Sequence, residues 1–399
     1  MPRIDPAAFE FSLSWQSEAA DHVDRLYLDS IDLQRDIFPG DMQRTAPRLQ
    51  PGESISADFD PGQLTPPDRP QQRLRFARKL FDGGRSPVPI VPRTGRFYPQ
   101  CLAPKVFNCF KGDLTPFRLI EVDDQQMLGD GNHPLARYPL TLTATRMPNP
   151  DRIRQYAAAR LDIGEQVTLR GPGMQAPHAA TDTDFFGAYP FARDNDEDDA
   201  RHYLEPRLVP HLDSPVRRQL SKLHTRLLGQ GDRVLDLMSS HLSHVSAELN
   251  LEMTGLGMNA EELAANKRLS DFIVQDLNRL PRLPFDDNSF DGAICTSSVE
   301  YLTDPLAVMR EMARVIRPAG VFVCSFSNRW FPGKQIQPWG EMHPFERLGL
   351  VLDLYRREGL FCDLHSESIR GYPGPRHDRQ PAVIPAADPL YAVWGRVSG

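Results

Sequence analysis

The stretch "VLDLMSSHLSHV", Val234 to Val245, decides the fold. Its apolar start is typical of the first strand of an α/β fold, where the next turn normally contains glycines that let the backbone approach a ligand. That turn here contains Met238, Ser239, Ser240, His241 and His244. Serines are small enough for the same approach, so we expect a binding turn that Asp236 orients. A tight turn with no ligand remains the alternative.

Short apolar runs and amphipathic helices alternate through residues 214–399, which we assign to one domain. The pattern predicts strands at 233–238, 252–257, 271–277, 290–297 and 320–327. It predicts helices at 214–228, 259–269, 304–316 and 345–360, the first capped by Ser214. Residues 362–369 and 389–397 should form an antiparallel pair. Such alternation implies a largely parallel sheet with helices on both faces.

The part of the chain before residue 214 has a different pattern. Many of the 37 prolines fall in its first third, which favours turns and short strands. Residues 117–147 predict an antiparallel meander with a tight loop at Asp130–Pro134. We therefore expect an N-terminal extension over 1–35, a β-rich domain over 36–150, and a linker over 151–213. Aromatic residues in the linker suggest that it serves as a lid.

The composition excludes several classes of protein. With 399 residues, of which 40% are hydrophobic and 25% charged, the chain is expected to form two soluble domains. No apolar run has the roughly 20 residues needed to cross a bilayer. A net charge of -7 argues against nucleic acid binding. The five cysteines are scattered without CxxC, which disfavours disulfides and zinc. No secretory signal is evident, so a cytoplasmic location is expected.

Ligands of open parallel sheets bind at the carboxyl ends of the strands, so the loops there supply the candidates. Asp276 could accept a hydrogen bond from a purine amino group, with capping as the alternative. Asn259 could cap a helix at a plain turn instead of binding. The candidate cofactor-binding residues are Asp236, Met238, Ser239, Ser240, Gly257, Met258, Asn259, Asp276, Leu277, Asn278 and Ser297.

The segment from about residue 231 to 397 resembles class I S-adenosylmethionine-dependent methyltransferases. The resemblance rests on "RVLDLM", "DLNRLPRLPFDDNSFDGAICTSSVEYLTDP" and "EMARVIRPAGVFVCSFSNRWF". The stretch "LDLMSSHLSHV" also resembles the corresponding sequence in an uncharacterised, small-molecule-type branch of that family. The resemblance implies a Rossmann-like seven-stranded sheet, S-adenosylmethionine as cofactor, and methyl transfer to a small molecule. Two features depart from the family pattern: the GxGxG loop is absent, and Gly257 replaces the acidic residue that ends strand two.

Methyl transfer needs few catalytic groups, because it depends mainly on in-line positioning. The candidate catalytic residues are Tyr203, His211, Glu300 and Tyr301, and each also has a structural interpretation. Arg207, Ser327, Asn328 and Arg329 are further candidates near the site. Trp330 and Trp339 could line an apolar pocket or pack in the core. His241 and His244 would share a face if a helix followed the first strand. Because no third ligand is set by spacing, no metal site is expected.

Residues 116–147, "PFRLIEVDDQQMLGDGNHPLARYPLTLTATRM", resemble the closing strands of SlyD-like prolyl isomerases of the FKBP type. The upstream "FPGDMQRTAPRLQPGESI" is similar to the same family. This resemblance implies a small FKBP-like domain ahead of the methyltransferase-like one. The alternative function is therefore a non-catalytic binding or scaffold protein, a methyltransferase fold fused to a chaperone-like FKBP fragment. A prolyl isomerase is a third hypothesis. A small-molecule acceptor is the expected partner, with no nucleic acid and no membrane; protein partners stay unknown.

Overall fold

The chain forms two compact units in a computed structural model. The structure describes residues 7–84, 90–149, 160–169, 171–178, 182–187, 191–375 and 386–399. The N-terminal unit comprises residues 1–190 with 341–350, and the C-terminal unit comprises 191–340 with 351–399. Residues 151–159, at the start of the predicted linker, lie outside the described residues.

The N-terminal unit contains two antiparallel sheets. One sheet has the order β2-β1-β8-β3 and the other has the order β4-β7-β6-β5. The strands are β1 (Ala7–Gln16), β2 (Asp21–Ile31), β3 (Ser54–Phe59), β4 (Arg73–Ala77), β5 (Phe97–Pro99), β6 (Pro116–Val122), β7 (Gln126–Asp130) and β8 (Leu140–Met147). Short helices are α1 (Met42–Thr45), η1 (Ala46–Arg48), η2 (Pro70–Gln72), η3 (Arg78–Leu80), η4 (Gln100–Leu102), α2 (Pro104–Phe107) and α3 (Ile163–Thr168).

Strand β1 shows why the N-terminal unit starts earlier than expected. Phe9, Phe11, Leu13 and Trp15 alternate with polar residues, and all four are buried in the core of this unit. Strict alternation of this kind is typical of a strand with one buried face. The predicted extension over residues 1–35 therefore contains β1 and β2, two strands of the sheet.

The predicted meander over residues 117–147 is only half right. Strands β6 and β7 pair with each other, as expected. Strand β8 instead pairs with β1 and β3 in the other sheet. The pattern of a single strand does not specify its partner, because pairing depends on distant segments that offer a complementary face.

The C-terminal unit is an α/β structure. Its strands are β9 (Arg233–Leu237), β10 (Glu252–Gly257), β11 (Asp271–Val274), β12 (Phe290–Thr296), β13 (Ile316–Phe326), β14 (Phe361–Arg370) and β15 (Leu390–Val397). Its helices are α4 (Asp199–His202), α5 (Ser214–Leu227), η5 (Ala247–Leu249), α6 (Ala260–Ala265), η6 (Val299–Tyr301) and α7 (Pro305–Val315). Helices α8 (Gln337–Glu341) and α9 (Pro344–Arg356) contain the boundaries between the units.

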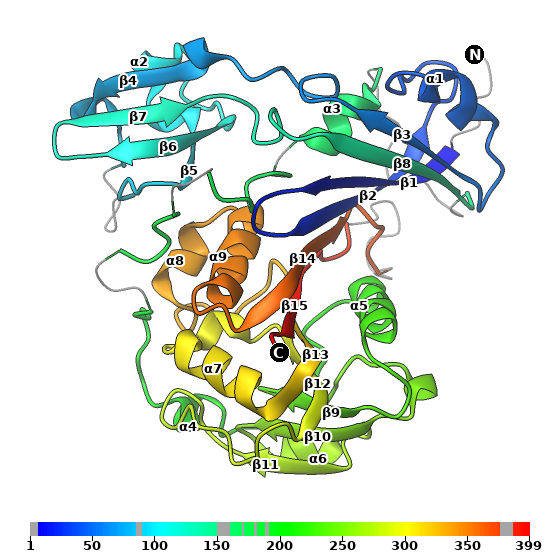
Figure 1. Cartoon of the computed structure of the whole chain (residues 1–399), viewed down its shortest axis with the longest axis vertical. Coiled ribbons are helices and arrows are strands. Elements are labelled where there is room, and N and C mark those ends of the chain that lie inside the picture. The colour runs from blue at the N-terminus through cyan, green and yellow to red at the C-terminus, as the bar shows by residue number, and fades with distance from the viewer. Residues whose placement is uncertain are drawn as a thin grey trace. The chain divides into compact units, whose positions relative to one another are not determined.

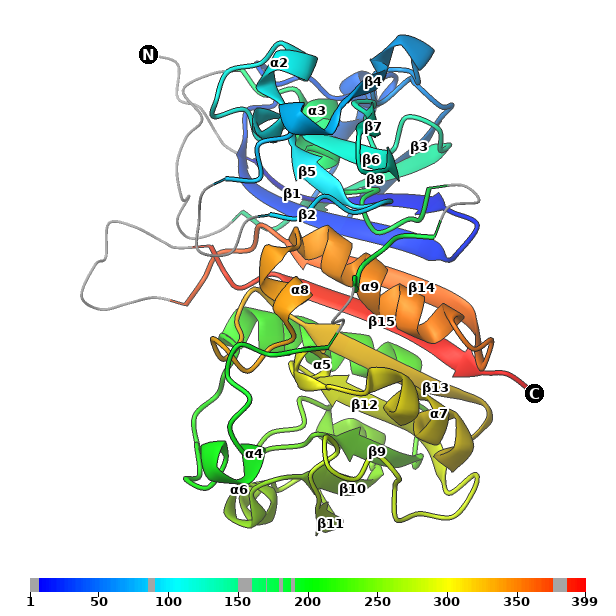
Figure 2. The same cartoon turned by 90° about the vertical axis from the view of Figure 1, so that its left-hand side faces the viewer.

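The strands of the C-terminal unit follow the order β11-β10-β9-β12-β13-β15-β14. Strands β9 to β13 pair with one another in parallel, while β15 runs antiparallel to both β13 and β14. Figure 2 shows β13, β12, β9 and β10 side by side. The chain moves outward from β9 to β11 and then returns to place β12 on the other side of β9. This reversal creates a crevice at the carboxyl ends of β9 and β12, where open sheets bind ligands.

Helices cover both faces of this sheet, as the sequence predicts. Figure 1 shows α5 and α7 on opposite sides of it. Val216, Leu220 and Leu223 of α5 pack in one cluster with strand residues that include Val234 and Ile294. The cap of α5 differs from the prediction, because Asp213 accepts the Val216 N–H and Ser214 is the first helical residue. Among the described residues, no helix is long and apolar enough to cross a membrane.

A buried ionic network anchors helix α4 within the C-terminal unit. Asp199 accepts hydrogen bonds from Arg193 (2.7 Å), Lys334 (2.9 Å) and the Asn278 amide (2.9 Å). The Lys334 side chain is only 1% exposed and that of Asp199 only 4%. Burial would raise the pKa of Asp199, but these hydrogen bonds hold the pKa below its usual value. The network therefore joins α4 to the loop that follows β11.

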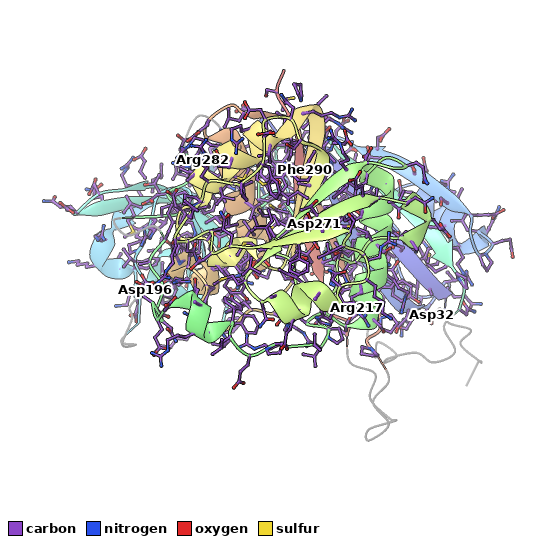
Figure 3. The ribbon with its side chains drawn as sticks, turned by 90° about the horizontal axis from the view of Figure 1, so that it is seen from below. Asp32, Asp196, Arg217, Asp271, Arg282 and Phe290 are labelled. Atoms are coloured by element: carbon purple, nitrogen blue, oxygen red, sulfur yellow. The ribbon has the colours of Figure 1, made fainter. Side chains whose placement is uncertain are left out.

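We predict that Asp199→Ala lowers the free energy of unfolding by about 3–5 kcal/mol, because it leaves the buried Lys334 without its carboxylate. Asp196→Ala is the matched control. Asp196 also contacts Arg193, but its side chain is 81% exposed and lies before α4 (Figure 3). Its loss should cost less than about 0.5 kcal/mol. Chemical denaturation followed by circular dichroism measures both values, and equal effects would contradict the role of the network.

Candidate active site

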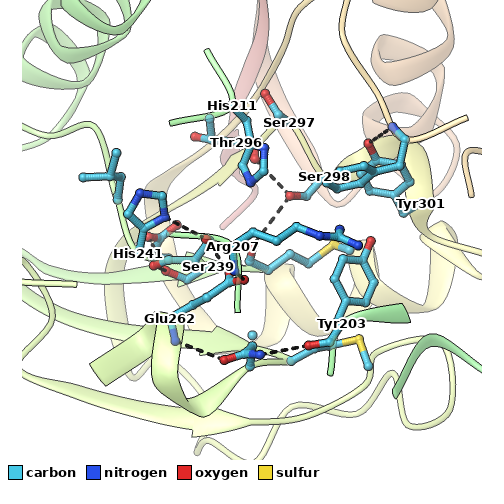
Figure 4. A pocket seen from close by; sticks show the side chains of 18 of the residues that line it. Tyr203, Arg207, His211, Ser239, His241, Glu262, Thr296, Ser297, Ser298 and Tyr301 are labelled. Atoms are coloured by element: carbon cyan, nitrogen blue, oxygen red, sulfur yellow. Dashed lines mark hydrogen bonds between the residues drawn. The ribbon is translucent and has the colours of Figure 1, made fainter. Parts of the chain in front are cut away.

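A cavity opens at the carboxyl edge of the C-terminal sheet (Figure 4). Its volume is about 380 Å³, and its walls come from the ends of β9, β10, β11 and β12, from residues 199–212 and from residues 329–331. Small-molecule sites usually occupy roughly 300–1,000 Å³. The topology of the strands therefore creates a cavity of ligand size at the point where their order reverses.

The structure brings most of the predicted site residues to this cavity. The lining residues include Asp236, Met238, Ser239, Ser240, Gly257, Met258, Asn259, Asp276, Leu277, Asn278 and Ser297. Three of the four catalytic candidates, Tyr203, His211 and Tyr301, also line it. Glu300 does not line the cavity and is fully buried in η6. The prediction that Glu300 acts on a substrate is therefore not supported, because the side chain of this strand-end residue points into the protein.

The turn after β9 keeps the shape of a glycine turn without the glycines. Met238 has φ of 55°, in the left-handed region that favours glycine. The following backbone turns across β10, where the Ser239 N–H donates to the Leu256 carbonyl over 2.7 Å. No helix follows, since residues 239–246 are irregular. The conditional prediction that His241 and His244 share a helix face is therefore wrong, although both line the cavity.

Both serines of this turn donate their hydroxyls to carboxylates. The Ser239 Oγ donates to Asp236 over 2.7 Å, and the Ser240 Oγ donates to Glu262 over 2.6 Å. Asp236 therefore orients the turn, as the sequence predicts. Glu262 was missed, although it stands three residues after the helix cap Asn259, a spacing typical of a residue that folds back over a helix start. Glu262 lines the cavity and also accepts the Arg207 backbone N–H over 2.7 Å.

Gly257 ends β10 because no side chain fits there. A Cβ atom at this position would lie 2.2 Å from the Ser239 carbonyl oxygen. The close approach of the two backbones explains why an acidic residue is absent from the end of β10. Carboxylates reach the cavity from β9, α6 and the loop after β11 instead, through Asp236, Glu262 and Asp276.

Two asparagines predicted to bind cofactor already bind the protein. The Asn259 oxygen caps α6, and its amide donates to the Tyr203 and Leu204 carbonyls over 2.9 and 3.1 Å. The Asn278 amide donates to Asp199 and to the Tyr301 carbonyl, and its oxygen accepts the Thr303 N–H. Their side chains therefore hold loops in place, because each amide group is saturated by these bonds.

Other side chains that line the cavity can still form contacts with a ligand. Asp276 accepts the Asn278 N–H at one carboxylate oxygen, and its second oxygen lies 4.0 Å from the exposed Arg279 side chain. The Ser297 Oγ is buried and has no hydrogen-bond partner among the described residues. Leu277 is also buried and offers an apolar surface beside Asp276. A purine ring with an amino group fits these three residues.

Burial changes the ionisation of several lining groups. It raises the pKa of Asp236 to about 6, and hydrogen bonds from Ser243 and Ser239 only partly oppose the shift. Burial also raises the pKa of Tyr203 and of Tyr301, with Asp199 and Glu300 respectively as the next causes. Burial lowers the pKa of His211. At neutral pH the tyrosines and His211 are therefore uncharged.

Phe331, which the sequence analysis did not select, is the centre of an aromatic wall. The rings of His202, His211, Tyr301 and Tyr203 lie 5.5, 5.6, 5.8 and 6.3 Å from its ring. Its neighbour Trp330 lines the cavity, which was one of the two alternatives predicted for this residue. Trp339 is fully buried and packs on Phe326, so it belongs to the core. Within the described ranges, no group of three or more potential metal ligands was found.

Comparisons with known proteins agree with this geometry. Residues 229–324 match a family described as "Methyltransferase domain". The chain is 26% identical over 153 residues to the ubiquinone/menaquinone biosynthesis C-methyltransferase UbiE of Chromobacterium violaceum, covering 36% of this chain and 62% of that protein. It is 31% identical over 134 residues to a ubiquinone biosynthesis O-methyltransferase of Xanthomonas campestris, covering 31% and 54%. The chain thus spans less than two thirds of these relatives.

Solved structures show a weaker likeness. A possible histamine N-methyltransferase from Thermotoga maritima superimposes with a TM-score of 0.33 and 14% identity, covering 46% of this chain and 92% of that one. The family match supports the predicted methyltransferase domain over residues 229–324. The cavity suits S-adenosylmethionine, since the Asp276 carboxylate can accept from an amino donor and the buried Ser297 hydroxyl has no hydrogen-bond partner among the described residues.

We predict that Gly257→Ala lowers the free energy of unfolding by at least about 1–3 kcal/mol, the usual range for overpacking. The added Cβ would force the Ser239 backbone away from β10. Gly340→Ala in α8 is the control, because its Cβ would be 3.7 Å from the nearest atom, in the flexible Gln335 side chain. Thermal and urea unfolding measure both variants. Wild-type stability of Gly257→Ala would mean that the two backbones are not in close contact.

We also predict a pH-dependent effect of Asp236→Asn. The pKa of Asp236 rises from 3.8 to about 6 on folding. Between these values the folded chain keeps a proton that the unfolded chain has lost, so wild-type stability falls as pH rises through this window. The asparagine avoids that cost and should be up to about 3 kcal/mol more stable at pH 7, with no such gain below pH 4. Urea unfolding at pH 3.5, 5 and 7 measures the difference, and a constant difference would contradict the shift.

Proposed function

We propose that this protein transfers a methyl group from S-adenosylmethionine to a small-molecule acceptor bound in the same cavity. The proposal rests on one observation: at the point where the strand order reverses, three cavity-lining residues can still bind a ligand. They are Asp276, Leu277 and Ser297. The family match over residues 229–324 supports the same activity. The alternative, a non-catalytic binding or scaffold protein, is not favoured, because the matching family and the relatives described above are named as methyltransferases.

The residues act mainly by positioning. When bound, S-adenosylmethionine supplies a methyl group on a positively charged sulfur, which needs little further activation. Asp276 would accept the purine amino group, while Asp236 and Glu262 keep the β9 turn in its binding conformation through Ser239 and Ser240. His211 is uncharged at neutral pH and could accept a proton from the acceptor, if the acceptor must lose one.

The names of the relatives suggest the size class of the methyl acceptor. The two relatives described above are named for C- and O-methylation in quinone biosynthesis. We extend to this chain only the inference of a small organic acceptor. The LDLMSS branch, the seven-stranded family sheet, the FKBP-like N-terminal domain, the cytoplasmic location and the absence of nucleic-acid and membrane partners stay predictions.

We predict that Asp276→Asn weakens binding of S-adenosylmethionine by about 5- to 150-fold, corresponding to roughly 1–3 kcal/mol. The asparagine oxygen can still accept the Asn278 N–H, so the local turn is retained. Its amide group, however, would face the purine amino group with hydrogens. Isothermal titration calorimetry with S-adenosylhomocysteine and S-adenosylmethionine measures the change.

Asp271→Asn is the matched control for this experiment. Asp271 is exposed and begins β11 (Figure 3), the strand that precedes the loop of Asp276. Its substitution should leave the dissociation constant within about twofold. Absence of heat with wild-type protein at millimolar ligand would remove the proposed function. Normal affinity of Asp276→Asn would remove only the role of Asp276.

A further inference from the structure

Among the residues that the structure describes, the Arg207 guanidinium has no acidic partner, unlike the charged side chains near it. Its polar contacts are both with His202: one nitrogen lies 3.3 Å from the ring Nε2, and another donates to the carbonyl over 3.2 Å. Within the described part of the chain it forms no ion pair. Arg193, Arg329 and Lys334, in contrast, each pair with an aspartate at 2.7–2.9 Å. A positively charged side chain that lines a cavity and is not paired with an acid is suited to bind an anion.

The backbone holds Arg207 in this position. Its N–H donates to Glu262 over 2.7 Å, so the carboxylate binds the backbone and leaves the guanidinium free of it. Four residues earlier, the Tyr203 carbonyl accepts from the Asn259 amide over 2.9 Å. Both anchors belong to α6 or its cap. The charge is therefore preorganised, which lowers the entropic cost of binding a ligand.

The surroundings of the guanidinium are flat and aromatic. The Arg207 Cζ lies 4.7 Å from the centre of the Phe331 ring and 6.0 Å from that of Tyr203. In Figure 4 the Arg207 side chain reaches toward Tyr203 and Tyr301. The Tyr301 hydroxyl accepts the Phe331 N–H over 2.8 Å, which fixes these two rings relative to each other. Because burial keeps both tyrosines protonated, neither ring adds a negative charge, and the nearby Asp199 is already paired with Arg193 and Lys334.

The acidic side chains that line the cavity come from several elements, and Asp199 among them is paired with Arg193 and Lys334. Asp236, Glu262 and Asp276 belong to β9, to α6 and to the loop after β11. Asp276 suits an amino group of the cofactor, whereas Asp236 and Glu262 hold Ser239 and Ser240 of the β9 turn. Arg207 and the aromatic rings form a second region of the cavity. A planar ligand with a negative charge suits this second region.

We propose that the methyl acceptor is an aromatic carboxylate, stacked on the wall of Tyr203, Tyr301 and Phe331 and paired through its carboxylate with Arg207. This inference rests on the proposed function, since it names the acceptor class for the same cavity. The cofactor also carries a carboxylate, so the experiment must determine which of the two anions binds Arg207.

Calorimetry on the full-length chain saturated with S-adenosylhomocysteine tests the proposal. The probes are 3,4-dihydroxybenzoate, its uncharged methyl ester, and cyclohexanecarboxylate, which has the charge without the planar ring. Wild type should bind the aromatic acid at least tenfold more tightly than either of the others. Arg207→Gln should abolish the advantage over the ester, whereas Arg207→Lys, which keeps the charge but not the planar group, should retain part of it.

Two controls make these results interpretable. Arg201→Gln removes an exposed arginine of α4 and should change no affinity by more than twofold. Thermal unfolding should show that Arg207→Gln folds like the wild type. The affinity of Arg207→Gln for S-adenosylhomocysteine should also stay within twofold of the wild-type value.

Three outcomes would overturn the proposal. Equal wild-type affinity for the acid and the ester would remove the role of the anion, and equal affinity for cyclohexanecarboxylate would remove the role of the aromatic wall. A tenfold loss of S-adenosylhomocysteine affinity in Arg207→Gln would assign Arg207 to the carboxylate of the cofactor. Failure of wild type to bind S-adenosylhomocysteine would instead count against the proposed function. The acid and ester can then still be compared on the free protein.

Discussion

The close contact between the Ser239 carbonyl and Gly257 determines how the site of the C-terminal unit is built. The two backbones approach so closely that β10 must end without a side chain. A turn without glycines can follow β9 because Met238 adopts a left-handed conformation, which costs roughly 1–2 kcal/mol. Carboxylates then reach the cavity from other elements, and Glu262 of α6 holds the turn through Ser240. The missing glycine motif and the missing acid are thus two consequences of one packing arrangement.

Saturated polar side chains hold the walls of the cavity in place. Asn278 joins the loop after β11 to α4 and to the loop after β12, through Asp199 and the backbone of Tyr301 and Thr303. Asn259 joins α6 to the segment that carries Arg207. Since these amides are fully used within the protein, binding capacity remains with other groups, chiefly Asp276, Ser297 and Arg207. Rigid supports of this kind allow a small number of free groups to select a ligand.

Much of the C-terminal unit could be predicted because its signals are local. The run over 252–257 matches β10 residue for residue, and the antiparallel pair near the C-terminus is confirmed. The loops after the strands also identified most of the cavity lining. Prediction failed where partners are distant in sequence. Strand β8 pairs with β1 and β3 and not with β7, and Glu300 points into the core. Phe331 and Glu262 were not predicted, because their importance comes from neighbours on other elements.

The sequence by itself determined the alternation of strands and helices in residues 214–399, and with it the edge of the sheet at which a ligand would bind. Periodicity is enough for this, because parallel strands connected by helices align their carboxyl ends. Only the tertiary structure decided which side chains are still available to a ligand. That availability depends on hydrogen bonds and ion pairs between distant segments, which saturate Asn259, Asn278 and Asp199 and leave the charge of Arg207 uncompensated.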